Sequence, residues 1–330
     1  MQRNGRPRQR ALPLLLAGAA AAAVGGILAS LAHLAWWLEL FSHFRAQYAA
    51  LLVACGAGLL LMRRPGLGVA ALALAAANAI PLLHYLGPTG EHGPERGAVK
   101  AVLLNLWFRN ERHDRVLDYL ERTRPDLAVF LEATPAWGDA LRQLDGLLPY
   151  HAQAGEVFVA SRMPLAELRA VPLAESGAMA VVFGFEAPQG MLTVIAAHAN
   201  WPLGPATAAS RNLELARLAE LAREATGPAV VLGDFNVTAY SPVFVELLAR
   251  SGLHDCAAGQ GLHATWPALF PPLYLQIDHC LADPHIRILG LRSGPWVGSD
   301  HFPLEVELGL PESSGHPRVR ASRAPPTSRR

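Results

Sequence analysis

Carboxylate and amide side chains directly follow a buried-strand pattern in the second half of the chain. The apolar run Val230–Leu232 ends at Gly233, and Asp234 and Asn236 come next. Glycine permits a tight exit from a strand, and the i, i+2 spacing keeps both side chains on one side of an extended backbone. Side chains placed in this way can hold a phosphate oxygen, a metal-bound water or a proton. An ordinary Asp/Asn turn has the same local sequence, so the interpretation depends on the rest of the chain.

Polar residues also follow other short apolar runs. These residues are Asn105, Glu132, His198, Asp278, Asp300 and His301. One carboxylate at a strand end indicates little, but the repetition predicts that several strand ends converge on one site. Alternation along a strand points His279 away from Asp278, so we expect His279 to pack against its neighbours.

Charge is unevenly distributed over the 330 residues. Residues 99–310 contain 15 basic and 23 acidic side chains, a net charge of −8, and the remaining residues carry +9. An acidic region of this kind does not bind duplex nucleic acid through general electrostatics.

Three cysteines lie far apart, without a CxxC pair, which argues against a zinc site or a disulfide framework. Cys55 falls in an apolar run and is expected to pack there. Cys256 and Cys280 could pair in an oxidising compartment, but we expect two buried free thiols.

The N-terminal region, residues 1–96, is predicted to cross a membrane three times. Its apolar runs cover about residues 12–34, 46–62 and 67–86. The second run is short for a span, which tilt or local thinning of the bilayer accommodates. A basic start followed by an apolar run also resembles a signal peptide, but the first run is long and two more follow it.

Arginine placement predicts the orientation of the spans. The basic N-terminus and the pair Arg63 and Arg64 should lie in the cytoplasm, so that three spans leave everything after Leu86 outside. The aromatic loop Trp36–Phe44 should then lie at the outer membrane surface, as an interfacial belt or an amphipathic helix. Residues 87–97, rich in Gly and Pro, are predicted to be a linker.

Residues 97–310 are predicted to form one α/β domain, because short apolar runs alternate there with amphipathic segments. One of the predicted strands covers Leu273–Ile277 and ends at Asp278. The segment 311–330 is rich in Pro, Ser and Arg and is predicted to be a disordered tail.

Several motifs resemble the endonuclease/exonuclease/phosphatase superfamily, also called DNase I-like, and the three spans resemble a membrane-anchored bacterial branch of it. The matching segments occur in the family's order over Val99 to Leu310. They are Leu104-Asn105, Phe130-Leu131-Glu132, Ser161-Arg162-Met163-Pro164, Ala197-His198, Gly233-Asp234-Phe235-Asn236, Ile277-Asp278-His279 and Gly298-Ser299-Asp300-His301-Phe302-Pro303. The resemblance implies a four-layer α/β sandwich, with two mixed sheets face to face and helices outside.

Phosphoester hydrolysis requires a hard cation, an activated water and stabilisation of developing charge. Carboxylate and amide ligands suit Mg²⁺ or Mn²⁺. By resemblance, Glu132 ligates the metal with Asn105 orienting it, and Asp300 lies beside it.

The resemblance also implies roles for the remaining residues. Asp234 orients or deprotonates the attacking water, and Asn236 holds the phosphate. His301 contacts the scissile phosphate and is oriented by Asp278, whose charge favours the protonated imidazole. His198 occupies the family's second histidine position. A turn cap is an equal alternative for Asn105, and a structural histidine competes with the catalytic role of His198.

Two features depart from the family's pattern. Many members carry an acidic residue just after the first-strand asparagine, where Leu106 and Trp107 stand here. In addition, no sequence position identifies the carboxylate that partners the second histidine in the nucleases. Both departures predict a leaner metal site and argue against DNase-like activity.

The expected protein is a metal-dependent phosphodiesterase in a bacterial inner membrane, with its catalytic domain on the periplasmic side. The acidic domain favours small or lipid-borne phosphoesters, with nucleic acid as the substrate of a nuclease alternative. A membrane-tethered binding module without turnover is a further alternative.

Overall fold

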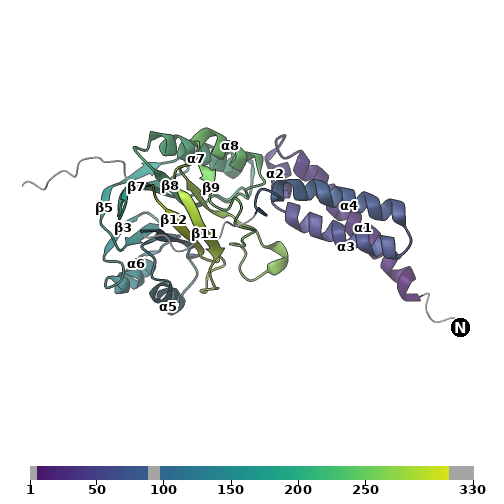
Figure 1. Ribbon diagram of the computed structural model, residues 1–330, viewed down its shortest axis with the longest axis horizontal. Coiled ribbons are helices and arrows are strands. Elements are labelled where there is room, and N and C mark those ends of the chain that lie inside the picture. Colours follow the sequence, from purple (N-terminus) through teal and green to yellow (C-terminus); the bar gives the residue numbers. More distant parts are fainter. Residues whose placement is uncertain (1–5, 88–96, 312–330) are drawn as a thin grey trace, which may run out of the picture.

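The computed structural model describes residues 6–87 and 97–311, and shows a helical bundle joined end-on to an α/β domain (Figure 1). Most of the predicted linker and tail, 88–96 and 312–330, lies outside the described residues.

Three helices build the bundle: α1 (Arg6–Ser30), α3 (Arg45–Leu61) and α4 (Pro65–Ala79), the last continued by the 3-10 turn η1 (Ile80–Leu82). Small residues let α3 and α4 approach closely, because a Cβ added at Gly56 would lie 3.1 Å from the Gly68 carbonyl oxygen. Two segments, Ala11–Ser30 and Pro65–Leu82, are long and apolar enough to cross a membrane. A third candidate is α2 (Trp36–Ser42) together with α3, two helices bent by 56°. The described helices thus provide two or three candidate spans.

The α/β domain contains two six-stranded mixed sheets, as predicted. The first has the order β11-β12-β1-β2-β4-β3 and the second the order β5-β6-β7-β8-β10-β9. The strands of the first sheet are β1 (Val99–Asn105), β2 (Leu127–Leu131), β3 (Tyr150–Ala154), β4 (Val157–Ser161), β11 (Arg287–Ser293) and β12 (Leu304–Gly309). Those of the second are β5 (Leu165–Pro172), β6 (Met179–Ala187), β7 (Gly190–His198), β8 (Ala229–Asp234), β9 (His254–Asp255) and β10 (Asp278–Ala282).

Helices cover the outer face of each sheet. On the first sheet lie α5 (His113–Thr123), α6 (Pro135–Leu141) and the turn η2 (Arg142–Leu144). On the second lie α7 (Pro205–Glu224) and α8 (Pro242–Ser251), and the short turn η3 (Pro271–Leu273) sits in the loop before β10. Along β1, Leu103 packs between the sheets while Leu104 packs against the helices. Because both faces of the central strands are buried, these strands are continuous apolar runs rather than alternating ones.

The edge strands β3 and β5 were not predicted, and their side chains are mostly exposed or half-buried. An edge strand with one solvated face has no continuous apolar run, so its sequence lacks the signal that identified the central strands.

Strand directions bring the polar residues to one edge of the domain. The pairs β1/β2 and β7/β8 are parallel. Asn105, Glu132, His198 and Asp234 therefore lie at or directly after the carboxyl ends of these strands, on the same side. The strand β10 runs antiparallel to β8 and places Asp278 directly opposite Asp234. The prediction that a strand ends at Asp278 was therefore wrong: β10 begins there, as its antiparallel direction requires.

The expectation of two free thiols at Cys256 and Cys280 was also wrong, because the structure joins them in a disulfide with a Cα–Cα distance of 5.4 Å. The Cys256 N–H donates to the Cys280 carbonyl at 2.9 Å, just beyond the β9/β10 pairing, so the two residues are cross-strand neighbours. Cys55 is free and buried, as expected.

Candidate active site

Asp234 lies at the centre of the polar cluster, at the end of β8, and is fully buried. The Asn105 side-chain amide donates to Asp234 Oδ2 at 3.2 Å and to Glu132 Oε1 at 2.9 Å. Asn105 and Glu132 belong to the first sheet and Asp234 to the second. One amide therefore links carboxylates of both sheets across the sandwich.

The turn after β1 fixes the orientation of this amide and of Glu132. The Trp107 N–H donates to Asn105 Oδ1 at 2.9 Å, and the Phe108 N–H donates to Glu132 Oε2 at 3.0 Å. Trp107 and Glu132 have φ values of 58° and 54°, a left-handed conformation that is unfavourable for non-glycine residues. Such strain is typical of functional sites, where the surrounding structure holds it in place.

His301 and Asp278 form a second buried pair beside Asp234. His301 Nδ1 lies 2.8 Å from Asp278 Oδ2, and its Nε2 lies 3.7 Å from Asp234 Oδ2. Burial by itself lowers the pKa of His301, but the charge and hydrogen bond of Asp278, together with the charge of Asp234, raise it to about 9. His301 is therefore a protonated imidazolium at neutral pH.

The loop before β12 delivers His301 through Ser299. The Ser299 hydroxyl donates to the Asn105 carbonyl oxygen at 2.7 Å and accepts from the His301 N–H at 3.0 Å. Gly298, with φ of 102°, permits the turn that brings this loop back to β1. The Gly-Ser-Asp-His motif thus positions His301 against the end of the first strand.

His198 forms a third ion pair, with a residue that the sequence did not identify. His198 Nδ1 donates to Glu156 Oε1 at 2.8 Å, and its Nε2 lies 3.8 Å from Asp234 Oδ2. Burial lowers the pKa of His198, but the Glu156 hydrogen bond and the charges of Asp234, Glu156 and Glu132 raise it to about 9. The hydrogen bond from His198 in turn lowers the pKa of Glu156.

Glu156 supplies the histidine partner for which no sequence position could be named. It follows Gly155 in the tight turn between β3 and β4, and precedes the apolar run Val157–Ser161 instead of ending one. A search for acidic residues that begin buried strands, as well as those that end them, would have included it.

Asn236 and Asp300 complete the cluster. Asn236 has a φ of 50°, and its amide donates to the Ala199 carbonyl at 2.8 Å while its N–H donates to Asp234 Oδ1 at 2.9 Å. Asp300 accepts a 3.4 Å bond from Trp266 Nε1. Burial raises the pKa of Asp300, and among the charged neighbours Glu132 raises it further while His301 lowers it.

Three buried polar atoms of the cluster have no hydrogen-bond partner among the described residues: Asp278 Oδ1, Asp300 Oδ1 and His198 Nε2. A separate geometric group consists of Asp234, Asp278 and His301, whose ligand atoms lie within 4.8 Å of one another. Within this group His301 Nδ1 and Asp278 Oδ2 already lie 2.8 Å apart, so a cation held by the trio would compete with that bond.

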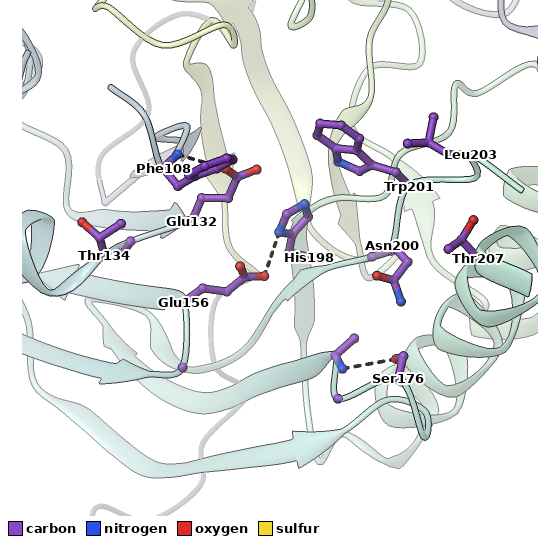
Figure 2. A pocket seen from close by; sticks show the side chains of 15 residues that line it. Phe108, Glu132, Thr134, Glu156, Ser176, His198, Asn200, Trp201, Leu203 and Thr207 are labelled. Atoms are coloured by element: carbon purple, nitrogen blue, oxygen red, sulfur yellow. Dashed lines mark hydrogen bonds and ion pairs between the residues drawn. The ribbon is translucent and has the colours of Figure 1, made fainter. Parts of the chain in front are cut away.

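An open cavity of about 710 Å³ lies in front of the cluster (Figure 2). Glu132, Glu156 and His198 point into it, with Phe108 on one side and Trp201 on the other. Asp234 does not line the cavity, but His198 and Glu132 connect the cavity wall to it. The arrangement offers an entry for a small or narrow substrate toward the buried carboxylates.

The structure brings every predicted site residue into this one cluster: Asn105, Glu132, His198, Asp234, Asn236, Asp278, Asp300 and His301. His279 is excluded, as expected; it is fully buried, stacks on Phe235 and lies 2.8 Å from the Val237 carbonyl oxygen through its Nε2.

Comparisons with known proteins agree with this geometry. The sequence profile described as Endonuclease/Exonuclease/phosphatase family matches residues 102–301. No curated protein matches the chain.

Among solved structures, an endonuclease/exonuclease/phosphatase from Bacteroides vulgatus has a TM-score of 0.56 at 19% identity, covering 66% of this chain and 100% of its own. The beta toxin of Staphylococcus aureus gives 0.51 at 16% identity, covering 63% and 99%. D. rerio TDP2, complexed with a single-strand DNA product, gives 0.54 at 14% identity, covering 64% and 99%. At these identities the likeness establishes the fold.

We predict that Glu156→Gln lowers the pKa of His198 from about 9 toward its ordinary value of about 6.5. Because the folded pKa is raised, the pair stabilises the fold fully below about pH 6.5, and this contribution is lost as the pH rises through about 9. NMR titration of the His198 imidazole tests this, with the exposed-site variant Glu246→Gln as control. An unchanged titration in Glu156→Gln would contradict the pairing.

Proposed function

Because the chain belongs to the endonuclease/exonuclease/phosphatase family, we propose that it is a membrane-anchored, metal-dependent phosphodiesterase. The observation that carries this proposal is one cluster in which Asp234 lies within 3.8 Å of two paired histidines and shares the Asn105 amide with Glu132, beside a cavity lined by Glu132 and His198. In such a site, the carboxylates can accept a proton from water, and the protonated imidazoles can neutralise the negative charge of a phosphate.

The residues fit a hard divalent cation at Glu132 and Asp300, with Asn105 orienting Glu132. Asp300 Oδ1 is buried without a hydrogen-bond partner among the described residues, and Glu132 raises the pKa of Asp300 in addition to the effect of burial. Two neighbouring carboxylates with an unused oxygen are what a Mg²⁺ or Mn²⁺ site requires. When bound, the cation supplies positive charge that polarises the phosphate and stabilises the transition state.

The chain's own residues then accept the proton of the water and hold the phosphate. Asp234 orients the attacking water and takes its proton; burial and the nearby charge of Asp278 raise the pKa of Asp234 above its ordinary value, against the charges of His301 and His198, and this makes its carboxylate a stronger base. His301 presents a protonated Nε2 to the phosphate while Asp278 fixes its ring through Nδ1. His198, held by Glu156, adds a second cationic donor facing the cavity, and Asn236 is placed to hold a phosphate oxygen.

The nuclease alternative remains the second candidate, because D. rerio TDP2, a structural neighbour, was solved with a single-strand DNA product. A binding module without turnover is less favoured, because it would not need a general base, an oriented imidazolium and a carboxylate pair in one cluster.

Placement at a membrane agrees with a lipid-borne substrate. The cavity rim carries exposed apolar side chains at Phe108, Trp201 and Leu203. The loop before β10 exposes Leu269 and Phe270, and the Gln47 amide at the start of α3 donates to the Tyr274 carbonyl of this loop at 2.8 Å. The loop that exposes Leu269 and Phe270 thus lies next to the end of the candidate spans that faces the domain.

The first prediction concerns topology, for which we propose a periplasmic catalytic domain in a bacterial inner membrane. Arginines at the N-terminus and at Arg63–Arg64 motivate it, and the Cys256–Cys280 disulfide supports an oxidising compartment. A phosphatase-type reporter fused after Leu310 should be active in cells. A reporter that works only in the cytoplasm would reverse the orientation.

The second prediction is that divalent cations bind at Glu132 and Asp300. Chelator should abolish hydrolysis and Mg²⁺ or Mn²⁺ should restore it. Glu132→Gln should weaken Mn²⁺ binding, followed by electron paramagnetic resonance, by about tenfold or more. Asp278→Asn should leave the Mn²⁺ affinity nearly unchanged. If Asp278→Asn abolishes binding and Glu132→Gln does not, the cation occupies the Asp234, Asp278 and His301 group instead.

The third prediction is that Asp234 and His301 act in the chemical step. Asp234→Asn and His301→Ala should each lower kcat by about 10²-fold or more, the effect of removing a positioned acid or base. Thermal stability should stay near wild type or rise, because these polar residues crowd charge at the site. Variants that unfold while their folded fraction keeps the wild-type rate would assign both residues a purely structural role.

The fourth prediction concerns substrate. The net charge of −8 over residues 99–310 disfavours collection of a long polyanion. We expect kcat/KM for soluble diesters and phospholipid vesicles to exceed that for plasmid DNA. The comparison is made at low and moderate salt. Efficient plasmid nicking that falls steeply with salt, without turnover of the other substrates, would favour the nuclease.

A further inference from the structure

The helix α2, which connects the first two candidate spans, lies against the catalytic domain. It packs on α7, and Leu38, Glu39 and Ser42 are buried in it while Trp37 is 49% exposed. Figure 1 shows α2 at the junction between the bundle and the domain, beside α8. The sequence predicted an aromatic segment at the membrane surface, but not the burial of its acidic residue.

Glu39 forms a buried ion pair with Arg211 of α7. Glu39 is 2% exposed and Arg211 is fully buried, although the two residues lie 172 positions apart. Arg211 Nη2 donates to Glu39 Oε2, and the Ser241 hydroxyl donates to Glu39 Oε1 at 2.6 Å. Both carboxylate oxygens are thus bound, as a buried charge requires.

The same guanidinium holds the backbone of a site residue. Arg211 Nη1 donates to the Asn236 carbonyl oxygen at 3.1 Å, and its Nε donates to Asn212 Oδ1 at 2.9 Å. Asn236 sits two residues after Asp234 in the strained left-handed conformation. The pair therefore fixes the peptide between Asn236 and Val237, directly after the two residues on which the proposed chemistry depends.

A second contact from the same connection reaches the next residues of this loop. His43 Nδ1 accepts from the Thr238 N–H at 3.4 Å and lies 3.0 Å from Thr238 Oγ1. Thr238 and Ser241 are both buried, and Ser241 also caps α8 by accepting from the Val243 N–H. Among the described residues, the side chains of Glu39 and His43 thus bond only to Arg211, Thr238 and Ser241.

We propose that Glu39 and His43 are positioning residues of the active site, which makes the connection between the first two candidate spans a working part of the catalytic domain. The loop 235–241 is fixed by the membrane region as well as by its own sheet. An anchor that only tethers would need no buried charge aimed at the catalytic loop. The part of this proposal that concerns turnover rests on the proposed phosphodiesterase activity.

The test uses the full chain in detergent micelles and the variants Glu39→Gln, Arg211→Met and His43→Leu. The control is Arg217→Met, which removes two partly exposed ion pairs of the same helix α7. Hydrogen exchange of the amides in 235–241 should become at least about tenfold faster in the three variants and stay unchanged in the control. Amides of β1 and β2 should exchange as in wild type.

Turnover should fall in the same variants. We expect kcat to fall at least about tenfold in Glu39→Gln, because small misplacements of reacting groups carry losses of this size, with KM within about twofold of wild type. The double variant Glu39→Gln/Arg211→Gln leaves no uncompensated buried charge. It should be more thermally stable than the single variants, but its kcat should stay low. If a single variant does not fold, exchange and turnover are measured in the double variant instead.

Two results would overturn the proposal: wild-type exchange in 235–241 in folded Glu39→Gln, or a kcat that recovers together with stability in the double variant. Absence of phosphodiesterase activity in the wild type would instead refute the proposed function, and the exchange measurement would still decide whether the connection holds the loop.

Discussion

Buried negative charge is the constraint on which the rest of the structure depends. Asp234 and Asp278 face each other across β8 and β10, Glu132 shares the Asn105 amide with Asp234, and the charge of Glu132 acts on Asp300. Carboxylates this close to one another in a low dielectric are unfavourable unless cations compensate them. His301 and His198, whose pKa values the neighbouring carboxylates raise to about 9 against the effect of burial, supply part of that compensation, and Asp278 Oδ1 and Asp300 Oδ1 are buried without a hydrogen-bond partner among the described residues.

The fold satisfies this constraint by strand direction. The strands β1 and β8, which have the parallel partners β2 and β7, end at Asn105 and Asp234. Their antiparallel neighbours run the other way and begin at the same edge: β10 begins with Asp278, and the loop before β12 carries His301. The Asn105 amide then joins the sheets at the point where their charges meet. The charges that the fold brings together here are unfavourable for stability and required for the proposed chemistry, so changes at Asp234 or His301 are expected to lower turnover before they lower stability.

The sequence was sufficient for the parts of this arrangement that leave a local pattern. Continuous apolar runs identified the central strands, and polar residues beside them, such as Glu132 and Asp234, identified the site. Glu156 begins a strand and was missed for that reason, and the Cys256–Cys280 pair depends on register at a short edge strand. The burial of Glu39 against Arg211 joins segments 172 residues apart, and nothing in either segment alone indicates it.

In the proposed reaction, this cluster activates a water molecule that attacks a phosphorus centre. The most direct measurement is hydrolysis of a soluble phosphodiester in ¹⁸O-labelled water, with mass spectrometry of both products. We expect one ¹⁸O atom in the phosphoryl product and none in the alcohol, at a rate that Asp234→Asn nearly abolishes. Label in the alcohol, or turnover in which Asp234→Asn is as fast as wild type, would contradict it.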